Sequence, residues 1–219
     1  MRIGYWLSLA KRTIYQAFYA TILFRFGFGE RINKKVWDKQ YEDNEWEYLS
    51  SEEEKEHYRA VIDQINKRGD KPVLLDIGCG HGVLYKYFTE SLKPGFGYLG
   101  IDISEIAIKK ATHYFPQGKF KVVDYDFEKL DGRFDIVVFN EVLNYFVKPV
   151  QTLLKAFEDN VADGGVIIIS MFRQENGRID LIWNDIDKKF NVLSTEVVTN
   201  AKGLTWTIKT ISQRLPVGS

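Results

Sequence analysis

The run VLLDIGCGHG (73–82) constrains the fold of this 219-residue chain more than any other stretch. An unbroken apolar segment ends in Asp76, and glycines then stand at alternate positions, Gly78, Gly80 and Gly82. A strand without polar alternation is typical of a parallel sheet that helices cover on both faces. Glycine permits positive φ and lets a ligand approach the bare backbone. The run therefore predicts a buried strand, a tight turn and a helix, with a ligand site at the turn.

Comparable apolar runs recur along the chain, and each is followed by a helical pattern. We expect strands at 73–78, 98–103, 119–124, 134–140 and 166–171. We expect helices at 51–66, 82–92, 105–115, 149–160 and 178–188. This alternation is typical of a doubly wound α/β sheet, in which helices connect parallel strands.

Three residues carry helix-start signals. Ser51 and Glu54 have the spacing of a capping box, which predicts that the first of these helices begins at Ser51. Ser104 directly follows the second strand and is placed to cap the helix after it.

The last two expected strands, 190–198 and 204–211, are separated by a short loop that contains Asn and Gly. A parallel pair would need a crossover of roughly a dozen residues, so this loop favours an antiparallel hairpin. The predicted fold is a mostly parallel, seven-stranded sheet with an antiparallel terminal strand.

Charge and cysteine content exclude several classes of function. The formal net charge is zero, and no basic stripe crosses the chain, so a nucleic acid is not an expected partner. Cys79 is the only cysteine, which excludes an intrachain disulfide and favours a reducing, cytoplasmic location. The histidines His57, His81 and His113 share no cysteine partners, and no metal site is expected.

The N-terminal part differs in composition from the rest. Residues 1–40 are basic and rich in aromatics, whereas residues 41–56 are acidic. Apolar residues recur at roughly helical spacing, so we expect residues 1–50 to form a helical cap on a domain spanning 51–219. A second interpretation stays open, in which residues 1–35 contact a membrane surface or gate the substrate.

A second acidic residue points to the kind of ligand. Asp102 lies 26 residues after Asp76, at the end of the second strand, where a carboxylate can accept hydrogen bonds from both hydroxyls of a ribose. The turn lacks the third glycine of the G-x-G-x-x-G dinucleotide pattern. Asp76 suits an ammonium group better than a pyrophosphate. These features favour S-adenosylmethionine over a nicotinamide dinucleotide, with an NAD(P)-type oxidoreductase as the alternative.

Five segments, in order, resemble the motifs of class I S-adenosylmethionine-dependent methyltransferases over residues 36–211. They are VLLDIGCGHG, YLGIDIS, KVVDYD, FDIVVFNEVLNYF and VADGGVIIIS. Upstream, VWDKQYEDNEWEYL resembles the W-x-x-x-Y stretch with which many members close over the cofactor. The resemblance implies a Rossmann-like methyltransferase fold, S-adenosylmethionine as cofactor and an enzymatic methyl transfer. The chain is similar to small-molecule members, those of ubiquinone biosynthesis and nodulation-factor synthesis.

The resemblance also implies cofactor-binding roles for residues near the strand ends. The residues assigned to the methionine end, the ribose, the adenine and the closing stretch are Tyr41, Asp76, Gly78, Gly80, Gly82, Asp102, Ile103, Asp124, Tyr125 and Asn140. Asp126 is an alternative to Asp124 for the adenine amino group, since VVDYD aligns with the motif in two ways.

The candidate catalytic residues are Glu141 and Tyr145, although helix capping and packing would also explain them. Relatives in ubiquinone biosynthesis carry Glu-His where this chain has Asn144-Tyr145. A phenol is a poor general base at neutral pH, and a base is needed only for acceptors that are weak nucleophiles when protonated. The missing histidine favours an amine acceptor, or an oxygen acceptor that another residue activates.

The expected function is methyl transfer to nitrogen or oxygen of a small molecule, with sugars, amino sugars and other metabolites as candidates. A non-catalytic protein that binds S-adenosylmethionine is a further alternative. In this fold the segment after the fifth strand usually contacts the acceptor, and here it offers Arg173, Gln174, Arg178 and Trp183. Neither the acceptor nor the oligomeric state follows from the sequence.

Overall fold

The computed structural model describes residues 22–69, 71–91, 96–174 and 177–214. Most of the segment for which the sequence predicts a basic amphipathic helix or a membrane contact, residues 1–21, lies outside these ranges. None of the helices within them combines the length and the apolar character that crossing a membrane requires.

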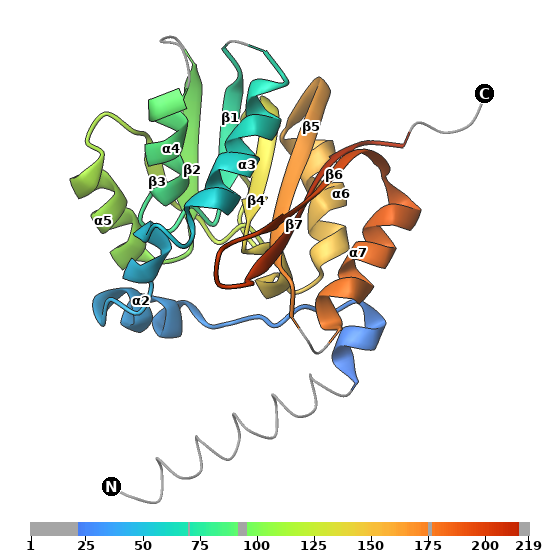
Figure 1. The fold of residues 1–219 in the computed structure, drawn as a ribbon, viewed down its shortest axis with the longest axis horizontal. Helices are drawn as coiled ribbons and strands as arrows, with labels where there is room; N and C mark the ends of the chain where they lie inside the picture. The colour runs from blue at the N-terminus through green and yellow to red at the C-terminus, as the bar shows by residue number, and fades with distance from the viewer. Residues whose placement is uncertain (1–21, 70, 92–95, 175–176, 215–219) are drawn as a thin grey trace, which may run out of the picture.

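One seven-stranded sheet forms the centre of the molecule, in the order β3-β2-β1-β4-β5-β7-β6 (Figure 1). Its strands are β1 (Val73–Ile77), β2 (Gly97–Asp102), β3 (Phe120–Val122), β4 (Phe134–Asn140), β5 (Val161–Phe172), β6 (Asn191–Thr199) and β7 (Thr205–Ser212). The pairs from β3 to β5 are parallel, whereas β7 runs antiparallel to both of its neighbours, β5 and β6. The predicted doubly wound sheet with an antiparallel terminal strand is confirmed.

Helices cover both faces of the sheet and its lower edge. They are α2 (Lys34–Glu42), α3 (Lys55–Asn66), α4 (Val83–Ser91), α5 (Glu105–Tyr114), α6 (Pro149–Asp159) and α7 (Arg178–Lys189), with short 3-10 turns η1 (Leu23–Phe26), η2 (Glu47–Ser50) and η3 (Leu143–Tyr145). Strand residues alternate between two cores. Leu74 and Ile136 pack with the buried residues of α3 and α4, whereas Leu75 and Val137 pack with those of α6 and α7. Burial on both faces explains the unbroken apolar runs.

Two predicted boundaries differ from the structure by more than two residues. The helix α3 begins at Lys55 instead of Ser51, because Glu54 makes no side-chain cap and its carboxylate lies beside His57 instead. The strand β5 begins at Val161, five residues earlier than expected, and a register shift lies in its pairing with β4. The predicted cap is confirmed at Ser104, whose side chain accepts a hydrogen bond from the Ala107 amide.

The segment before α3 runs beneath the carboxyl ends of the parallel strands (Figure 1). The Gly29 amide donates to Val147 O (3.0 Å) and the Glu30 amide to Asn144 O (2.7 Å). A Cβ at Gly29 would lie 2.1 Å from Phe146 O, so only glycine allows this close approach. Residues 28–31 are called the strap below, and they lie along the loop that follows η3.

Candidate functional site

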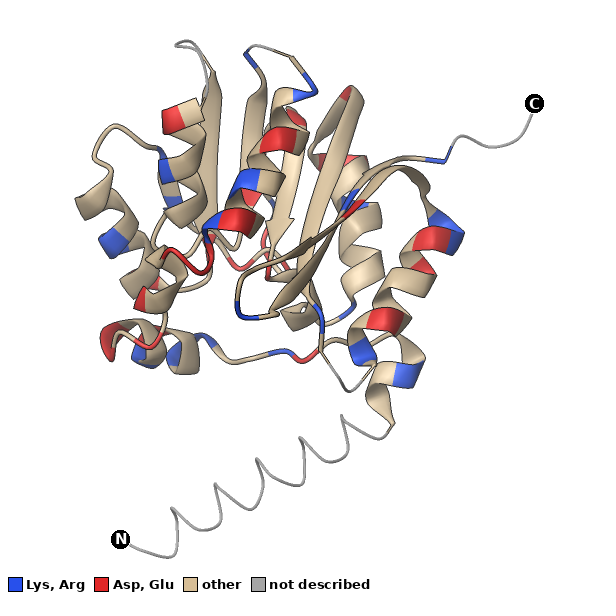
Figure 2. Ribbon diagram, in the orientation of Figure 1, with Lys and Arg blue, Asp and Glu red and all other residues tan. Residues whose placement is uncertain are grey.

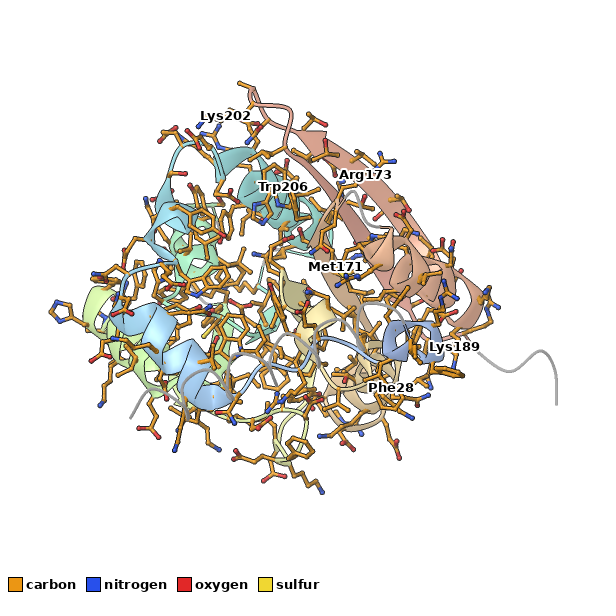
Figure 3. All side chains as sticks on the ribbon, turned by 90° about the horizontal axis from the view of Figure 1, so that it is seen from below. Phe28, Met171, Arg173, Lys189, Lys202 and Trp206 are labelled. Carbon is orange, nitrogen blue, oxygen red and sulfur yellow. The ribbon has the colours of Figure 1, made fainter. Side chains whose placement is uncertain are left out.

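A cavity of about 400 Å³ opens at the carboxyl ends of β1, β2, β4 and β5. This volume is typical of small-molecule sites. Its lower wall consists of residues between Arg31 and Leu49. Figure 3 views this side of the molecule, with Met171 and Trp206, both of which line the cavity, near the middle. The cavity lies where doubly wound sheets bind ligands.

The glycine turn forms part of the wall. Gly78 has φ +75° and Gly80 has φ +55°, a backbone region that other residues rarely adopt. A Cβ at Gly78 would lie 2.4 Å from a Val142 methyl group, and one at Gly80 would lie 2.6 Å from the Tyr41 hydroxyl. Gly82 also has positive φ, but it packs against Phe115 and does not line the cavity. Gly82 is therefore a packing residue in this structure.

Asp102 ends β2 with its carboxylate held by the backbone. The Gly80 amide donates to Oδ2 (3.0 Å), and the Ser104 amide donates to Oδ1 (2.8 Å). Each carboxylate oxygen has a second lone pair, so both can accept a further hydrogen bond from a ligand. Burial raises the pKa of Asp102 to about 6, although these two hydrogen bonds act in the opposite direction. A ligand that brings donors would therefore stabilise the carboxylate form.

Asp76 is the most deeply buried acid of the cavity, with an exposed fraction of 1%. The Tyr98 hydroxyl donates to its Oδ2 (2.7 Å). Burial raises the pKa of Asp76 to about 7, and Asp102 adds to the effect, while the Tyr98 hydrogen bond lowers it. A buried carboxyl of this kind is stabilised in its charged form by a nearby cation.

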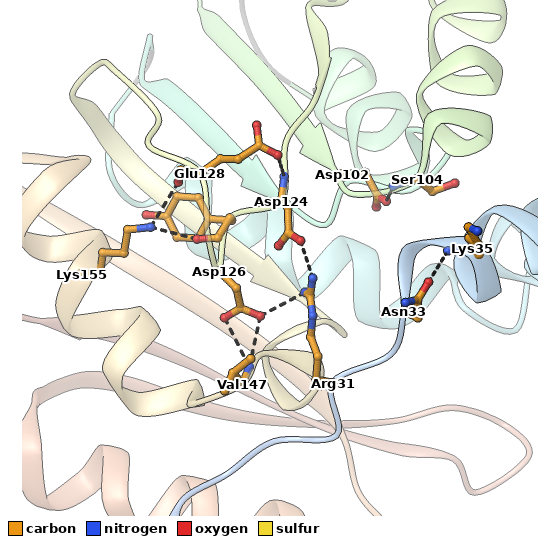
Figure 4. Close-up of polar contacts among 11 residues, drawn as sticks. Arg31, Asn33, Lys35, Asp102, Ser104, Asp124, Asp126, Glu128, Val147 and Lys155 are labelled. Carbon is orange, nitrogen blue, oxygen red and sulfur yellow. Dashed lines mark hydrogen bonds and ion pairs between the residues drawn. The ribbon is translucent and has the colours of Figure 1, made fainter. Parts of the chain in front are cut away.

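The loop after β3 contributes Asp124 and Tyr125 to the cavity wall and is joined to the strap by Arg31 (Figure 4). Arg31 from the strap donates to Asp124 (2.5 Å) and to Asp126 (3.0 Å). Asp126 also accepts from the Val147 amide and does not line the cavity, whereas Asp124 does. The Asp124 Oδ1 atom is buried and accepts no hydrogen bond from the described residues. Of the two acids, the geometry favours Asp124 as the ligand contact.

Ile103 and Tyr125 also belong to the cavity wall. Ile103 is half-buried and lines the cavity. Tyr125 also lines it, but its hydroxyl donates to Asn160 Oδ1 (2.7 Å) within the core. Tyr125 therefore offers a ligand no hydroxyl, only a surface to pack against.

The helix α2 closes the cavity from below. Asp38 accepts from the Ser104 hydroxyl (2.7 Å), which fixes α2 against the start of α5. Tyr41 is buried over Gly80, and the Trp37 ring meets the Tyr145 ring edge to face, with centroids 5.0 Å apart. The stretch expected to close over a cofactor thus lies over the cavity.

Replacing Arg31 with alanine is expected to loosen the strap and α2, because two carboxylates lose their shared cation. Charged hydrogen bonds at half-exposed positions contribute about 1.5 kcal/mol. Their loss should raise the fraction of molecules in which the strap and α2 are detached by about tenfold. Endoproteinase Lys-C cleaves after lysine only, so its rate at Lys34 and Lys35 measures opening without interference from the substitution. The control is Arg59→Ala, which removes an exposed ion pair with Glu56 (3.7 Å). If the Arg31→Ala and Arg59→Ala variants are cleaved at equal rates, Arg31 does not hold the strap and α2 in place.

The candidate catalytic residues lie just beyond β4. Glu141 has φ +58°, and its carboxylate accepts from the Ser170 hydroxyl (2.9 Å) and the Phe172 amide (2.8 Å). Burial raises the pKa of Glu141 above its usual value. Burial also raises the pKa of Tyr145, which makes this phenol a still weaker base at neutral pH. Both side chains line the cavity.

The segment after β5 contributes fewer residues to the cavity wall than the sequence suggests. Gln174 lines the cavity, but Arg173 is exposed and does not, and Figure 3 shows it outside the central group. Arg178 lies against the Phe24 ring (6.0 Å) and Trp183 is buried under Lys209. Of the four residues that the sequence offers here, only Gln174 lines the cavity, and Arg173 is the solvent-exposed arginine that the sequence equally allows.

Sequence reasoning missed several cavity-lining residues, among them Arg31, Glu54, Tyr58 and Trp206, and also missed His57, which contacts Asn140 and Trp206 from behind the cavity wall. His57 is fully buried, with its Nε2 3.0 Å from Asn140 Oδ1 and its Nδ1 3.4 Å from Glu54 Oε2. A signal was present, because Glu54 and His57 stand three positions apart on the buried side of an amphipathic helix, where polar residues are uncommon. Nothing near Arg31 in the sequence marks it.

The site has the features that an adenosyl cofactor requires. The residues combine a backbone cradle that a Cβ would fill, a strand-end carboxylate with spare lone pairs and a buried acceptor oxygen on Asp124. Within the described ranges, no three His, Cys, Asp or Glu side chains are grouped as metal ligands would be.

Comparison with known proteins agrees with this geometry. A family model described as "Methyltransferase domain" matches residues 44–213. "Putative methyltransferase 235L" of Invertebrate iridescent virus 6 is 31% identical over 146 residues, which are 67% of this chain and 51% of that protein. The chain therefore spans about half the length of this curated relative.

Solved structures share the fold at low identity. The N-methyltransferase NodS of Bradyrhizobium japonicum, in complex with S-adenosyl-L-homocysteine, superposes with a TM-score of 0.68 at 14% identity, covering 82% of this chain and 97% of its own. The 1,6-didemethyltoxoflavin-N1-methyltransferase of Burkholderia thailandensis reaches 0.62 at 18% identity, covering 82% and 86%. A TehB-like methyltransferase of Corynebacterium glutamicum reaches 0.60 at 16% identity, covering 82% and 100%.

Proposed function

Since this chain belongs to the methyltransferase-domain family, a family of S-adenosylmethionine-dependent enzymes, we propose that it transfers a methyl group to nitrogen or oxygen of a small molecule. The observation that carries the proposal is the cavity at the strand ends, where Asp102 and the glycine turn meet beneath α2. The same cavity continues past β4, which leaves space for an acceptor beside the cofactor. Its lower wall, formed by residues before 50, favours small acceptors over polymers.

Each part of the cavity would hold one part of the cofactor. Asp102 would bind the ribose hydroxyls and Asp124 the adenine amino group. Asp76, the turn backbone and the end of β4 at Asn140 would hold the methionine end. Ile103 and Tyr125 would pack on the adenine, and Tyr41 would close over the whole. We further propose that residues 1–50 act as a cap on the domain 51–219.

The chain's own contribution to the reaction is alignment and exclusion of water. When bound, S-adenosylmethionine supplies an electrophilic methyl group on a positively charged sulfur. Alignment of two reactants is worth about 7–11 kcal/mol, and a closed, water-poor site favours a step in which charge is lost. The buried Tyr41 and the docked α2 provide this closure.

Isothermal titration calorimetry tests the proposal. S-adenosylmethionine and S-adenosylhomocysteine should each bind with an affinity of about 1–10 μM, as expected for a metabolite site. Quenching of tryptophan fluorescence by NADH serves as the control for a dinucleotide site. Absence of binding heat with both adenosyl compounds, or quenching by NADH alone, would refute the proposed cofactor.

Cofactor binding is expected to weaken as the pH falls. The folded-state pKa values of about 7 for Asp76 and about 6 for Asp102 lie above the ordinary value of 3.8, so the ligand-free protein holds protons that a cationic ligand must displace. Affinity for S-adenosylmethionine should fall by at least about tenfold between about pH 8 and pH 5. Titrations in buffers of different ionisation enthalpy should show proton release on binding. A constant affinity without proton release would contradict this expectation.

The same pKa shifts make the ligand-free protein more stable at low pH, where cofactor binding is weaker. A carboxyl whose folded pKa exceeds its unfolded pKa stabilises the fold at low pH, and this contribution is lost as the pH rises through the folded value. The contribution of Asp76 and Asp102 to the free energy of unfolding is therefore lost between about pH 4 and pH 7. Cofactor binding offsets this loss near neutral pH.

A further inference from the structure

The part of the cavity beyond β4 has its own chemical character. We call it the acceptor compartment, and it is lined by Tyr48, Glu54, Tyr58, Glu141, Phe172 and Trp206. Four of these residues are aromatic and two are acids. Arg31 is the only Lys or Arg among the described residues that line the whole cavity, and it is paired with Asp124 and Asp126 at the other end. Figure 2 shows acidic residues concentrated in the turn that leads into α3, which contributes Glu54.

The aromatic wall is fixed by packing. The Trp206 ring stacks on His57, with centroids 5.1 Å apart and planes within 10° of parallel, and it meets the Phe172 ring edge to face at 5.6 Å. The Tyr58 ring, which also lines the compartment, stacks on the Tyr87 ring, with centroids 5.2 Å apart. Rigid aromatic faces attract cations as well as apolar groups. An acceptor with a flat or apolar body fits such a wall.

The two acids are held in place from different elements. Glu141 accepts hydrogen bonds from the Ser170 hydroxyl and the Phe172 amide, both at the end of β5. It keeps this position at φ +58°, a backbone conformation that costs a non-glycine residue energy and is often retained at functional sites. Glu54 is buried and lies 3.4 Å from His57, which in turn contacts Asn140, the residue before Glu141.

The two acids also influence each other, and among the described residues no salt bridge neutralises Glu141. Burial raises the pKa of Glu141 first of all, His57 lowers it, and the Glu54 carboxylate raises it further. Burying two carboxylates near one another costs free energy unless a cation compensates it. A cation bound between them would remove this cost, whereas an anionic acceptor would increase it and a neutral alcohol would leave it unchanged.

We propose that the acceptor is an amine on an apolar or aromatic body, which enters as an ammonium ion and binds between Glu54 and Glu141. This inference rests on the proposed function. One ammonium proton passes to Glu141, and the nitrogen lone pair then forms the new N–CH₃ bond. The methyl–sulfur bond breaks, and its electron pair stays on sulfur as the neutral thioether. Glu141 is thus the catalytic base, and His57 is a positioning residue for Glu54.

Matched compounds test the charge preference. The full chain is first saturated with S-adenosylhomocysteine and then titrated with 2-phenylethylamine, 2-phenylethanol or phenylacetate, and with glucosamine, glucose or glucuronate. At least one amine should bind about tenfold more tightly than its alcohol, and the acids should not bind, because charged hydrogen bonds and cation–π contacts favour the ammonium. Amines that bind no better than their alcohols, or not at all, would overturn the inference. If S-adenosylhomocysteine itself does not bind, the proposed function fails instead.

Two isosteric variants test the residues. Glu141→Gln and Glu54→Gln should each weaken binding of the preferred amine by about tenfold and leave the affinity for S-adenosylhomocysteine unchanged. The control is Glu158→Gln, at an exposed position on α6. Thermal unfolding of each variant, with and without S-adenosylhomocysteine, shows whether it is folded. A variant that loses affinity for S-adenosylhomocysteine would show that these acids hold the cofactor's own ammonium group, and the inference would be wrong.

Discussion

Replacing Asp102 with alanine is expected to weaken the binding of S-adenosylhomocysteine by at least about 100-fold. Each oxygen of this carboxylate has one lone pair in use by the backbone and one left for a ribose hydroxyl. Two charged hydrogen bonds contribute about 3–6 kcal/mol, and each 1.4 kcal/mol is tenfold in affinity. Isothermal titration calorimetry measures the change directly.

Two further variants separate binding from folding. Asp163→Ala removes an exposed aspartate in β5 and should leave the affinity unchanged. Asp102→Asn keeps the shape of the side chain and one good hydrogen-bond acceptor. Its affinity for S-adenosylhomocysteine should therefore lie between that of the Asp102→Ala variant and that of the unsubstituted chain. Because alanine also leaves the Gly80 and Ser104 amides without this partner, the thermal unfolding of each variant is measured as well. A folded Asp102→Ala protein that keeps its affinity within about twofold would remove Asp102 from the binding site.

Replacing Gly78 with alanine is expected to destabilise the protein by about 2–5 kcal/mol and to abolish cofactor binding. The left-handed conformation at φ +75° costs an L-residue about 1–2 kcal/mol, and overpacking costs about 1–3 kcal/mol. The clash arises because the new Cβ would lie 2.4 Å from Val142, whose branched side chain has little freedom to move. Urea unfolding measures the free energy of unfolding.

Gly164 provides a matched control for this experiment. It also has φ +75°, but a Cβ there would meet no atom within 4 Å. Gly164→Ala should therefore cost only the conformational part, about 1–2 kcal/mol. Adding Val142→Ala to Gly78→Ala should recover part of the packing cost and none of the conformational cost. Equal costs for the two single variants would show that Val142 does not impose glycine at position 78.

The sheet could be predicted from the sequence because its signals are local. Five apolar runs identify the parallel strands, and the short loop near Asn200 identifies the final hairpin. Asp102 and the glycine turn were found for the same reason, since each directly follows a strand and strand ends meet at one edge of a parallel sheet. Residues whose position follows from one strand alone are predictable without the structure.

The remaining part of the site depends on contacts between distant segments. Arg31 and Asp124 are 93 residues apart, and His57 and Asn140 are 83 residues apart, so no local pattern joins them. The capping-box prediction failed for a related reason. The Glu54 side chain has two possible partners, the helix start and His57, and it lies beside His57, whose ring is held by the distant residues Asn140 and Trp206. Local propensity cannot decide such a competition.

The position of β7 between β5 and β6 affects how this chain is made. During synthesis β6 emerges before β7, yet it has no neighbour in the sheet until β7 is present. The edge of β5 consequently stays unpaired until the ribosome has released residues 205–212, and exposed strand edges promote aggregation. Nascent chains stalled before this point should depend on chaperones, whereas a chain extended past it can complete its sheet in one step.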